Sequence, residues 1–251
     1  MRCGIDLGSR SVKLVIMDLD TKEQKAANVY ETAQFYREYG QRTENGLAVD
    51  FAVLGFPGVT SLTATGYGRN TINIVGATVI PELKAHMLGV IHQTGLTNFT
   101  LLDLGGQDSK VIKVRNGKMV DFQTNDKCAA STGRYLENMA AVLGISLEEL
   151  AGYSDNPVEL SATCAIFGES ELIGRIVEGY TTAELAAGVN YTIFKRIKPM
   201  LSALKSGQIV FTGGVALGTS IKEFITREMD VEVIIPQYPQ LNGAIGCAVY
   251  R

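Results

Sequence analysis

The sequence predicts an α/β protein built from two related halves, each of which begins with a strand, a glycine turn and a second strand. This pattern occurs at "MRCGIDLGSRSVKLVIMDLD" and returns at "LLDLGGQDSKVIKVRNGKMVDF". Between and after the two copies, short apolar runs alternate with longer segments of helical periodicity. At 251 residues the chain is long enough to bury a core without disulfides.

The two copies match at the positions that carry charge. Asp103 takes the place of Asp6 in front of a Leu-Gly pair, and Lys110 follows Asp103 at the spacing by which Lys13 follows Asp6. We therefore expect two structurally related lobes. The first would span 1–94, joined by a C-terminal helix over 243–251, and the second would span 95–242.

The remaining elements are expected to alternate along the chain. The polar residues 21 to 50 suit a strand and a helix on the outer face of the first lobe. Short apolar runs predict strands at Ala52–Leu54 and Ile209–Thr212. A period of 3.6 residues predicts helices at Glu82–Gln93, Gly133–Leu143, Glu169–Glu178, Ala183–Ser206 and Thr219–Glu228.

The composition argues against several classes of protein. The net charge is -3, and lysine and arginine are scattered, so we expect no nucleic-acid partner. No apolar run has the length of a membrane span and "MRCGIDLGSR" lacks an apolar signal region, so we expect a cytoplasmic protein without a membrane partner. Because the cytosol keeps thiols reduced, the four cysteines should be buried, catalytic or metal-binding rather than disulfide-bonded.

The acidic glycine turns suit a polyphosphate ligand. Glycine lets backbone N–H groups approach phosphate oxygens, and the carboxylates of Asp6 and Asp103 can hold Mg²⁺. A third motif, "IVFTGGVALGTSIKEFI", predicts a strand that delivers Gly213 and Gly214 to the start of a helix. This motif is not a P-loop, because Gly218 is followed by threonine and serine with no lysine.

The motifs "GIDLGS", "LLDLGGQD" and "FTGGVA" together resemble those of the superfamily of acetate and sugar kinases, heat-shock chaperone ATPases and actin. The resemblance implies an actin-like fold with two lobes around an ATP cleft. It implies nucleotide contacts by Asp6, Gly8, Ser9, Arg10, Ser11, Lys13, Gly105, Gly106, Gln107, Gly213, Gly214, Val215 and Gly243. Gln107, which would orient water, Asp103 and Glu82 are the expected catalytic residues.

Two cysteines lie where helices are expected to begin. Cys128 opens the segment "CAASTGRYLENMA", with Asp126 as its expected N-cap residue. Cys164 lies in "SATCAIFGESELIGRI", with Thr163 as its N-cap residue. The positive end of a helix dipole would stabilise a thiolate at both positions.

The other two cysteines, Cys3 in an apolar strand and Cys247 in a small-residue helix, are expected to be buried and inert. Two thiolates are too few for a closed zinc or iron-sulfur site, which normally has four protein ligands. A symmetric dimer would supply four, with the cluster on its twofold axis.

The segments "NDKCAASTGRYLE" and "SATCAIFGESELI", with "TGYGR" upstream, resemble the ATP-dependent activators of 2-hydroxyacyl-CoA dehydratases, in the BadF/BadG/BcrA/BcrD-type ATPase family. The resemblance implies a homodimer with one [4Fe-4S] cluster held by Cys128 and Cys164 of each chain. It also implies that ATP hydrolysis drives a low-potential electron from ferredoxin or flavodoxin into a dehydratase or another cluster-bearing reductase. Double-cubane cluster proteins and benzoyl-CoA reductase are the alternative acceptors.

Three residues depart from the family pattern: Arg10 after the first turn, Ser131 beside Cys128, and Leu217 after "TGGVA". A different class of function stays open, namely a small-molecule kinase of the same fold with inert cysteines. A kinase would need a carboxylate base such as Glu82 or Asp108. A filament or chaperone is less favoured, because the chain barely covers two lobes.

Overall fold

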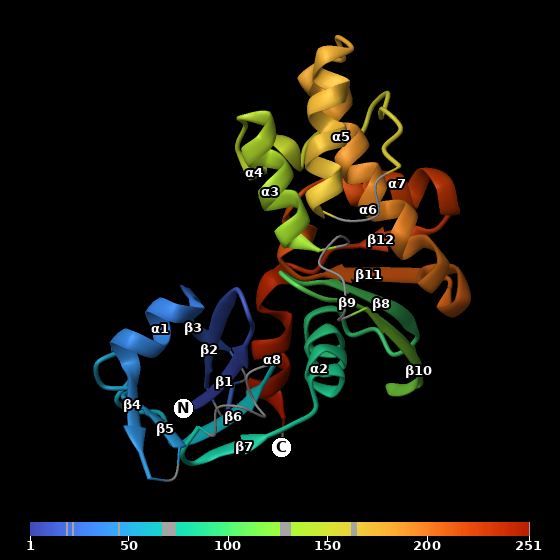
Figure 1. Ribbon diagram of the computed structural model, residues 1–251. Coiled ribbons are helices and arrows are strands. Elements are labelled where there is room, and N and C mark those ends of the chain that lie inside the picture. Colours follow the sequence, from blue (N-terminus) through green and yellow to red (C-terminus); the bar gives the residue numbers. More distant parts are fainter. Residues whose placement is uncertain are drawn as a thin grey trace. The chain divides into compact units, whose positions relative to one another are not determined.

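The computed structural model describes residues 1–18, 20–21, 23–44, 46–66, 74–125, 132–161 and 165–250. The chain divides into two compact units. The first consists of Met1–Leu96 with Leu241–Arg251, and the second of Thr97–Gln240. Each unit contains a five-stranded sheet (Figure 1).

The two sheets have the same topology. The first has the order β3-β2-β1-β6-β7, with β1 (Arg2–Leu7), β2 (Ser11–Met17), β3 (Gln24–Glu31), β6 (Ser61–Thr65) and β7 (Ala77–Val79). The second has the order β10-β9-β8-β11-β12, with β8 (Phe99–Leu104), β9 (Ser109–Arg115), β10 (Lys118–Asn125), β11 (Gln208–Thr212) and β12 (Glu232–Ile234). In each, three strands pair antiparallel and two more join in parallel. This shared topology confirms the predicted α/β fold with two related halves.

The alternation of side chains along β1 and β2 sorts the first unit into two layers. Ile5 and Leu14 belong to a cluster that also contains Phe35 of α1 (Thr32–Tyr39). Val15, on the opposite face of β2, packs against α8 (Asn242–Val249). Asp6 therefore lies on the face covered by α8, because it alternates with Ile5.

Glycine allows α8 to lie close to both β1 and α2 (Glu82–Thr94), and Figure 1 shows the two helices side by side. A Cβ atom at Gly4 would lie 2.0 Å from the Ala244 carbonyl oxygen, and one at Gly246 would lie 1.7 Å from the Ala85 carbonyl oxygen. A side chain at either position would therefore push the helix away from its neighbours.

Cys3 and Cys247 are both fully buried in the first unit. Burial raises the pKa of each thiol above its ordinary value. Both cysteines therefore remain neutral thiols at physiological pH. This confirms the prediction that they are buried and inert side chains.

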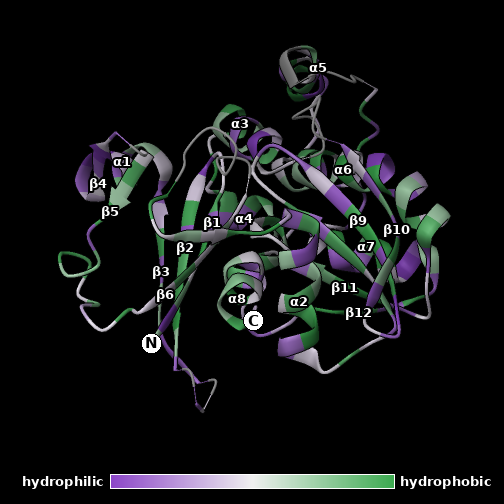
Figure 2. Cartoon of the chain, turned by 90° about the horizontal axis from the view of Figure 1, so that it is seen from below, coloured by the Kyte–Doolittle hydropathy of each residue, from purple (hydrophilic) through white to green (hydrophobic). Residues whose placement is uncertain are grey.

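The polar segment after β2 forms β3, α1 and a small hairpin of β4 (Gly40–Thr43) and β5 (Gly46–Val49), and β4 is mostly hydrophilic in Figure 2. The expected strand at Ala52–Leu54 is wrong, because these residues form a turn. The Asp50 carboxylate accepts hydrogen bonds from the backbone N–H of Ala52 at 2.9 Å and of Val53 at 3.2 Å. These bonds favour a local turn over strand pairing.

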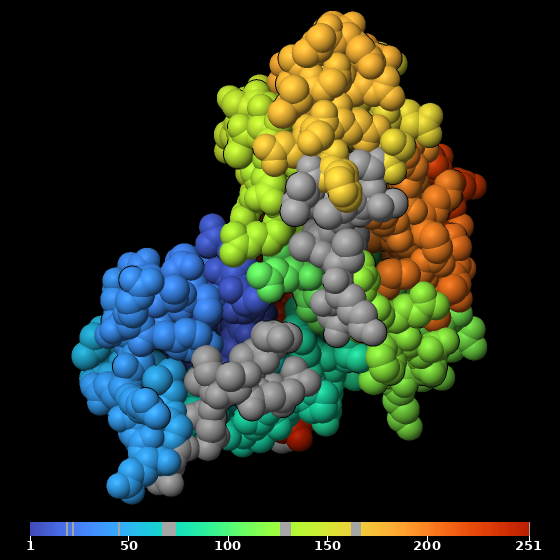
Figure 3. All heavy atoms as spheres, viewed as in Figure 1, coloured from blue at the N-terminus to red at the C-terminus, as the bar shows by residue number. Residues whose placement is uncertain are grey.

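Helices cover one face of the second sheet. They are α3 (Gly133–Leu143), α4 (Leu147–Leu150), α5 (Ala165–Val177), α6 (Thr182–Leu204) and α7 (Ser220–Met229). Residues of α3, α6 and α7 share one hydrophobic core with β8, β9 and β11. The five predicted helices are all present, although α5 begins four residues before the expected Glu169, and its atoms lie at the surface of the second unit (Figure 3).

The longest described helix, α6, begins with a capping box in which the side chains of Thr181 and Glu184 each bind the other residue's backbone N–H. A short 3-10 helix, Gly214–Leu217, separates β11 from α7. Within the described residues, no helix is long and apolar enough to cross a membrane.

The glycine contacts predict a large effect of a single methyl group. We expect Gly246→Ala to lower the free energy of unfolding by about 3 kcal/mol, because the new Cβ atom would overlap the Ala85 carbonyl oxygen. Gly174→Ala is the matched control, since this α5 glycine has no neighbour within 4 Å of an added Cβ atom. The control should raise the stability by about 0.5–1 kcal/mol. Urea unfolding followed by circular dichroism measures both, and equal effects would contradict the packing described for α8.

Candidate functional site

The first unit carries a buried carboxylate at the end of its central strand. Asp6, with 4% of its surface exposed, lies directly opposite Lys13 in the antiparallel pairing of β1 and β2. The Lys13 ammonium lies 3.4 Å from Asp6 Oδ2. The lysine therefore compensates the charge of a carboxylate that is almost removed from water.

Two glycines leave the Asp6 carboxylate uncrowded. A Cβ atom at Gly66, which has a φ of +100°, would lie 2.7 Å from Asp6 Oδ1, and one at Gly243 would lie 3.0 Å from Oδ2. Asp6 Oδ1 is buried and has no hydrogen-bond partner among the described residues. A carboxylate oxygen in this state fits the preference of Mg²⁺ for oxygen ligands.

A histidine that the sequence analysis did not single out lies beside this carboxylate. His86 of α2 is buried, and its Nε2 atom would lie 3.1 Å from a Cβ atom at Gly243, the glycine that also contacts Asp6. Glu82 Oε1 lies 3.9 Å from His86 Nε2, one helical turn away. Asn242 of α8 donates a hydrogen bond of 2.9 Å to the His86 carbonyl oxygen, which fixes α2 against α8.

The second unit repeats the carboxylate–lysine pair at the end of β8. Asp103 is 2% exposed, and Lys110 lies opposite it in the pairing of β8 with β9. The Lys110 ammonium lies 3.6 Å from Asp103 Oδ2 and 2.6 Å from Asp108 Oδ2. Thr212 donates a hydrogen bond of 2.9 Å from its hydroxyl group to Asp103 Oδ1, so both oxygens of Asp103 have a neighbour of suitable charge or polarity.

The turn after Asp103 is joined to the first turn of α3. The Gly105 carbonyl oxygen accepts a hydrogen bond of 2.9 Å from the Gly133 N–H, and the Gly106 carbonyl oxygen accepts one of 3.0 Å from the Arg134 N–H. These are two of the N–H groups that a helix start leaves unpaired. Gln107, in the same turn, is exposed.

The third glycine motif lies beside the same turn. Gly213 has a φ of +91°, and a Cβ atom there would lie 2.2 Å from the Leu104 carbonyl oxygen, so only glycine allows β11 to end this close to β8. Val215 of the 3-10 helix would lie 3.8 Å from a Cβ atom at Gly133. Gly214 has a single neighbour, the Gln240 amide, within 4 Å of an added Cβ atom.

The other predicted contacts of the first turn are less buried. A Cβ atom at Gly8 would lie 2.8 Å from the Lys13 ammonium, so glycine leaves the lysine room. Ser9 is exposed and Ser11 is half-buried. Arg10 lies 3.8 Å from Glu31, whose carboxylate caps α1, so this departure from the family pattern has a neighbour on β3.

Both proposed cluster ligands, Cys128 and Cys164, lie outside the described residues, as do the expected caps Asp126 and Thr163. The helix that follows Cys128 begins later than expected. The N-cap residue of α3 is Thr132, which has an extended backbone, and α3 begins at Gly133. The expectation that Asp126 caps α3 is therefore wrong, and α5 begins one residue after Cys164.

The described residues contain no cluster of three or more His, Cys, Asp or Glu side chains that could hold a metal ion. This suits Mg²⁺ held with a nucleotide, which takes one or two carboxylates and fills its other positions with phosphate oxygens and water. The sequence analysis did not assign a role to Lys110 or to Thr212. The repeat alone could have identified Lys110, because its equivalent Lys13 was among the predicted contacts.

Comparison with known proteins agrees with the geometry. The 2-hydroxyisocaproyl-CoA dehydratase activator of Clostridioides difficile is 34% identical over 98% of this chain and 93% of its own length. The (R)-2-hydroxyglutaryl-CoA dehydratase activating ATPase of Acidaminococcus fermentans is 34% identical over 98% of this chain and 95% of its own length. The solved structure of a Clostridium difficile activator with bound ADPNP has a TM-score of 0.85 at 31% identity and covers 99% of this chain and 93% of that one. Residues 3–250 match the BadF/BadG/BcrA/BcrD ATPase family, and the chain belongs to that family.

Proposed function

We propose that this protein is an ATP-hydrolysing activator that delivers a low-potential electron to a partner enzyme of the 2-hydroxyacyl-CoA dehydratase type. The observation that carries the proposal is the match over 98% of the chain to two relatives that are named as activators of such dehydratases. The duplicated carboxylate–lysine turn supports the ATP-binding part of the proposal, because it supplies polar groups for a polyphosphate and its metal ion in both units.

In the proposed site, Asp6 and Asp103 hold Mg²⁺ directly or through water, and Lys13 contacts the phosphates. Gln107 orients the water molecule that attacks the γ-phosphorus atom. The new oxygen–phosphorus bond forms as the bond to the ADP oxygen breaks, which yields ADP and phosphate. Magnesium supplies charge stabilisation for the phosphate oxygens when it is bound.

The proposed protein is a homodimer in which Cys128 and Cys164 of both chains hold one [4Fe-4S] cluster. When bound, such a cluster carries one electron, taken from reduced ferredoxin or flavodoxin and passed to the acceptor enzyme. The helices that follow the two cysteines pack on each other, which supports a shared role. The Tyr135 hydroxyl of α3 would lie 3.4 Å from a Cβ atom at Gly168 of α5.

The described residues also suggest how nucleotide state could reach the cysteine segments. The hydrogen bonds from the α3 N-terminus to Gly105 and Gly106 join a proposed phosphate turn to the segment after Cys128. On the other segment, Ser161 donates a hydrogen bond of 2.9 Å from its backbone N–H to Glu171 of α5. A shift of the phosphate turn would therefore move α3 and, through their contact, α5.

Benzoyl-CoA reductase is a second candidate acceptor, because one subunit of the Thauera aromatica enzyme is 24% identical over 98% of this chain. The small-molecule kinase is less favoured. One of its two candidate bases, Asp108, is bound by the Lys110 ammonium at 2.6 Å, which lowers its basicity. The other, Glu82, has the buried His86 ring nitrogen 3.9 Å away, so neither carboxylate is a free base.

Substitution of the two paired aspartates tests the ATP site. We expect Asp6→Asn and Asp103→Asn each to lower the rate of Mg·ATP hydrolysis by about 100-fold, because the proposed metal contacts lose their charge. The visible absorption of the anaerobically purified protein should not change. Asp155→Asn, at an exposed position of the second unit, is the control and should keep full activity. Loss of colour along with activity would show that the aspartates act on folding instead.

Removal of the proposed ligands tests the cluster. Cys128→Ser or Cys164→Ser should abolish the iron content and weaken the dimer, because each substitution would remove two of four ligands from the assembly. Iron analysis and light scattering under anaerobic conditions measure both effects. Cys3→Ala and Cys247→Ala are the controls, since both thiols are buried and neutral. A full complement of iron in either serine variant would refute the ligand assignment.

The proposed coupling predicts that cluster exposure depends on the nucleotide. We expect a chelator to remove iron faster from the protein with a non-hydrolysable ATP analogue than from the protein with ADP, because ATP can bias a conformational change only by binding the two states with different affinity. The time course of absorbance loss under anaerobic conditions measures this. In Asp103→Asn the two rates should converge, and equal rates in the unsubstituted protein would contradict the coupling.

A further inference from the structure

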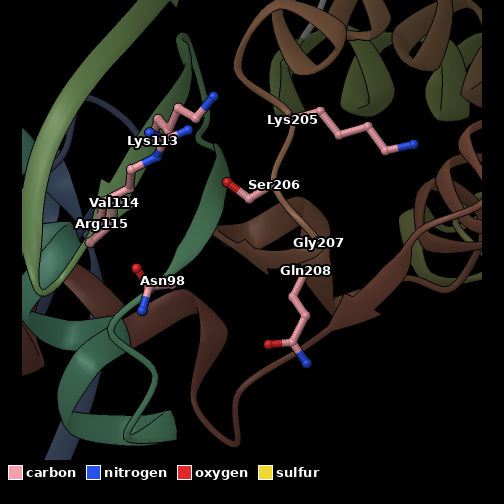
Figure 4. Close-up of a pocket in the computed structure, with 8 residues that line it drawn as sticks. All are labelled: Asn98, Lys113, Val114, Arg115, Lys205, Ser206, Gly207 and Gln208. Atoms are coloured by element: carbon pink, nitrogen blue, oxygen red, sulfur yellow. The ribbon is translucent and has the colours of Figure 1, made fainter.

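A cationic pocket lies on the second unit, at the end of its sheet opposite to Asp103 (Figure 4). Its volume is about 380 Å³, and Lys113, Arg115, Lys205 and Ser206 are among the residues that line it. Because β8 pairs with β9 so that Asp103 faces Lys110 and Phe99 faces Val114, the pocket is separated from the proposed phosphate turn by nearly the whole strand. This distance is roughly 13 Å for four residues.

The pocket forms where a helix ceases to cover the sheet. Val111, Lys113 and Arg115 alternate along β9 and therefore share one face. Val111 is fully buried in the core that includes α6. Lys113 is half-buried and Arg115 is exposed, because α6 ends at Leu204. The same face thus changes from apolar to cationic beyond the helix.

The charges of Lys113 and Arg115 are not matched by acidic partners. Neither side chain has an ion-pair or hydrogen-bond partner among the residues that the structure describes. The nearest acidic residue by strand register is Asp121, which faces Lys113 across β9 and β10, and its Oδ1 atom accepts the backbone N–H of Phe122 at 2.8 Å. Two full positive charges therefore face the pocket.

Neutral donors also line the pocket. Figure 4 shows the Ser206 hydroxyl oxygen pointing toward the strand that carries Lys113 and Arg115, while the Lys205 side chain extends away from them. The Lys205 ammonium donates a hydrogen bond of 2.5 Å to the Met229 carbonyl oxygen. Lys205 is therefore already engaged in holding the structure.

The bland explanation is that these cations only offset the negative end of the α6 dipole. That end carries about half a charge, which is less than the charge of either side chain. One of the last carbonyl groups of α6, that of Leu204, is already bound by the Thr100 hydroxyl at 2.6 Å. Dipole compensation therefore does not account for two cations without partners among the described residues.

We propose that this pocket binds a small phosphate-class oxyanion between the Lys113 ammonium, the Arg115 guanidinium and the Ser206 hydroxyl. A guanidinium and an ammonium give charge-assisted hydrogen bonds to phosphate oxygens, and the hydroxyl adds a neutral donor. The site is independent of the proposed ATP site, because it uses none of the same residues. The ligand could be free inorganic phosphate or the phosphate of a small monoester.

The test is a titration of the full-length protein with inorganic phosphate and, separately, with glycerol 3-phosphate, both with saturating Mg·ADP present. Amide NMR signals of Ser206 and Gly207 report on the pocket itself, so binding at the nucleotide site is not counted. We expect saturable shifts with a dissociation constant of about 1 mM or below. The ligand that binds more tightly identifies the source of the phosphate.

The double variant Lys113→Gln/Arg115→Gln should weaken this binding at least about tenfold. Lys118→Gln is the matched control, because it removes one charge from an exposed residue of the neighbouring strand β10 that does not line the pocket. Its effect should be less than about twofold. Unchanged binding in the double variant, or equal shifts with chloride, would overturn the proposal. Circular dichroism spectra of the variants exclude a loss of fold as the cause.

Discussion

The architecture of both units depends on one interaction, a buried carboxylate paired with a lysine directly across a β-hairpin. Asp6 with Lys13 and Asp103 with Lys110 occupy the same register positions in two sheets of the same topology. A carboxylate this far from water is costly unless a cation lies beside it. Because the register of a hairpin is fixed by its turn, a short glycine turn is what places each lysine opposite its aspartate.

Although the two turns are alike, their surroundings differ, and this difference bears on their roles. Asp103 accepts a hydrogen bond from Thr212 in addition to its lysine neighbour. Asp6 has one oxygen without a hydrogen-bond partner in the described part of the chain, with glycine on two sides and His86 close by. The Asp6 carboxylate is therefore the better candidate for direct contact with a metal ion, while Asp103 is held more firmly.

Close backbone approach by glycine links the proposed nucleotide site to the rest of each unit. In the first unit, Gly243 brings the start of α8 against Asp6. In the second, Gly213 brings β11 against the end of β8, and Gly105 and Gly106 bind the start of α3. A ligand that moved either turn would therefore act on a helix directly rather than through flexible side chains. Rigid contacts of this kind suit an ATPase whose proposed task is to pass a structural change to a redox group.

The sequence by itself determined the repeat, the α/β class and the positions of the glycine turns, because alternation, helical periodicity and the Asp-Leu-Gly motif are local patterns. It also predicted that Cys3 and Cys247 are buried. It did not predict the turn at Ala52–Leu54, where the Asp50 side chain competes with strand pairing. Only the tertiary structure placed His86 beside Asp6 and Thr212 on Asp103, because these contacts join residues 80 and 109 positions apart in the chain and depend on how α2 and β11 pack. For the same reason the cationic pocket could not be predicted, since it exists only where α6 ends over β9.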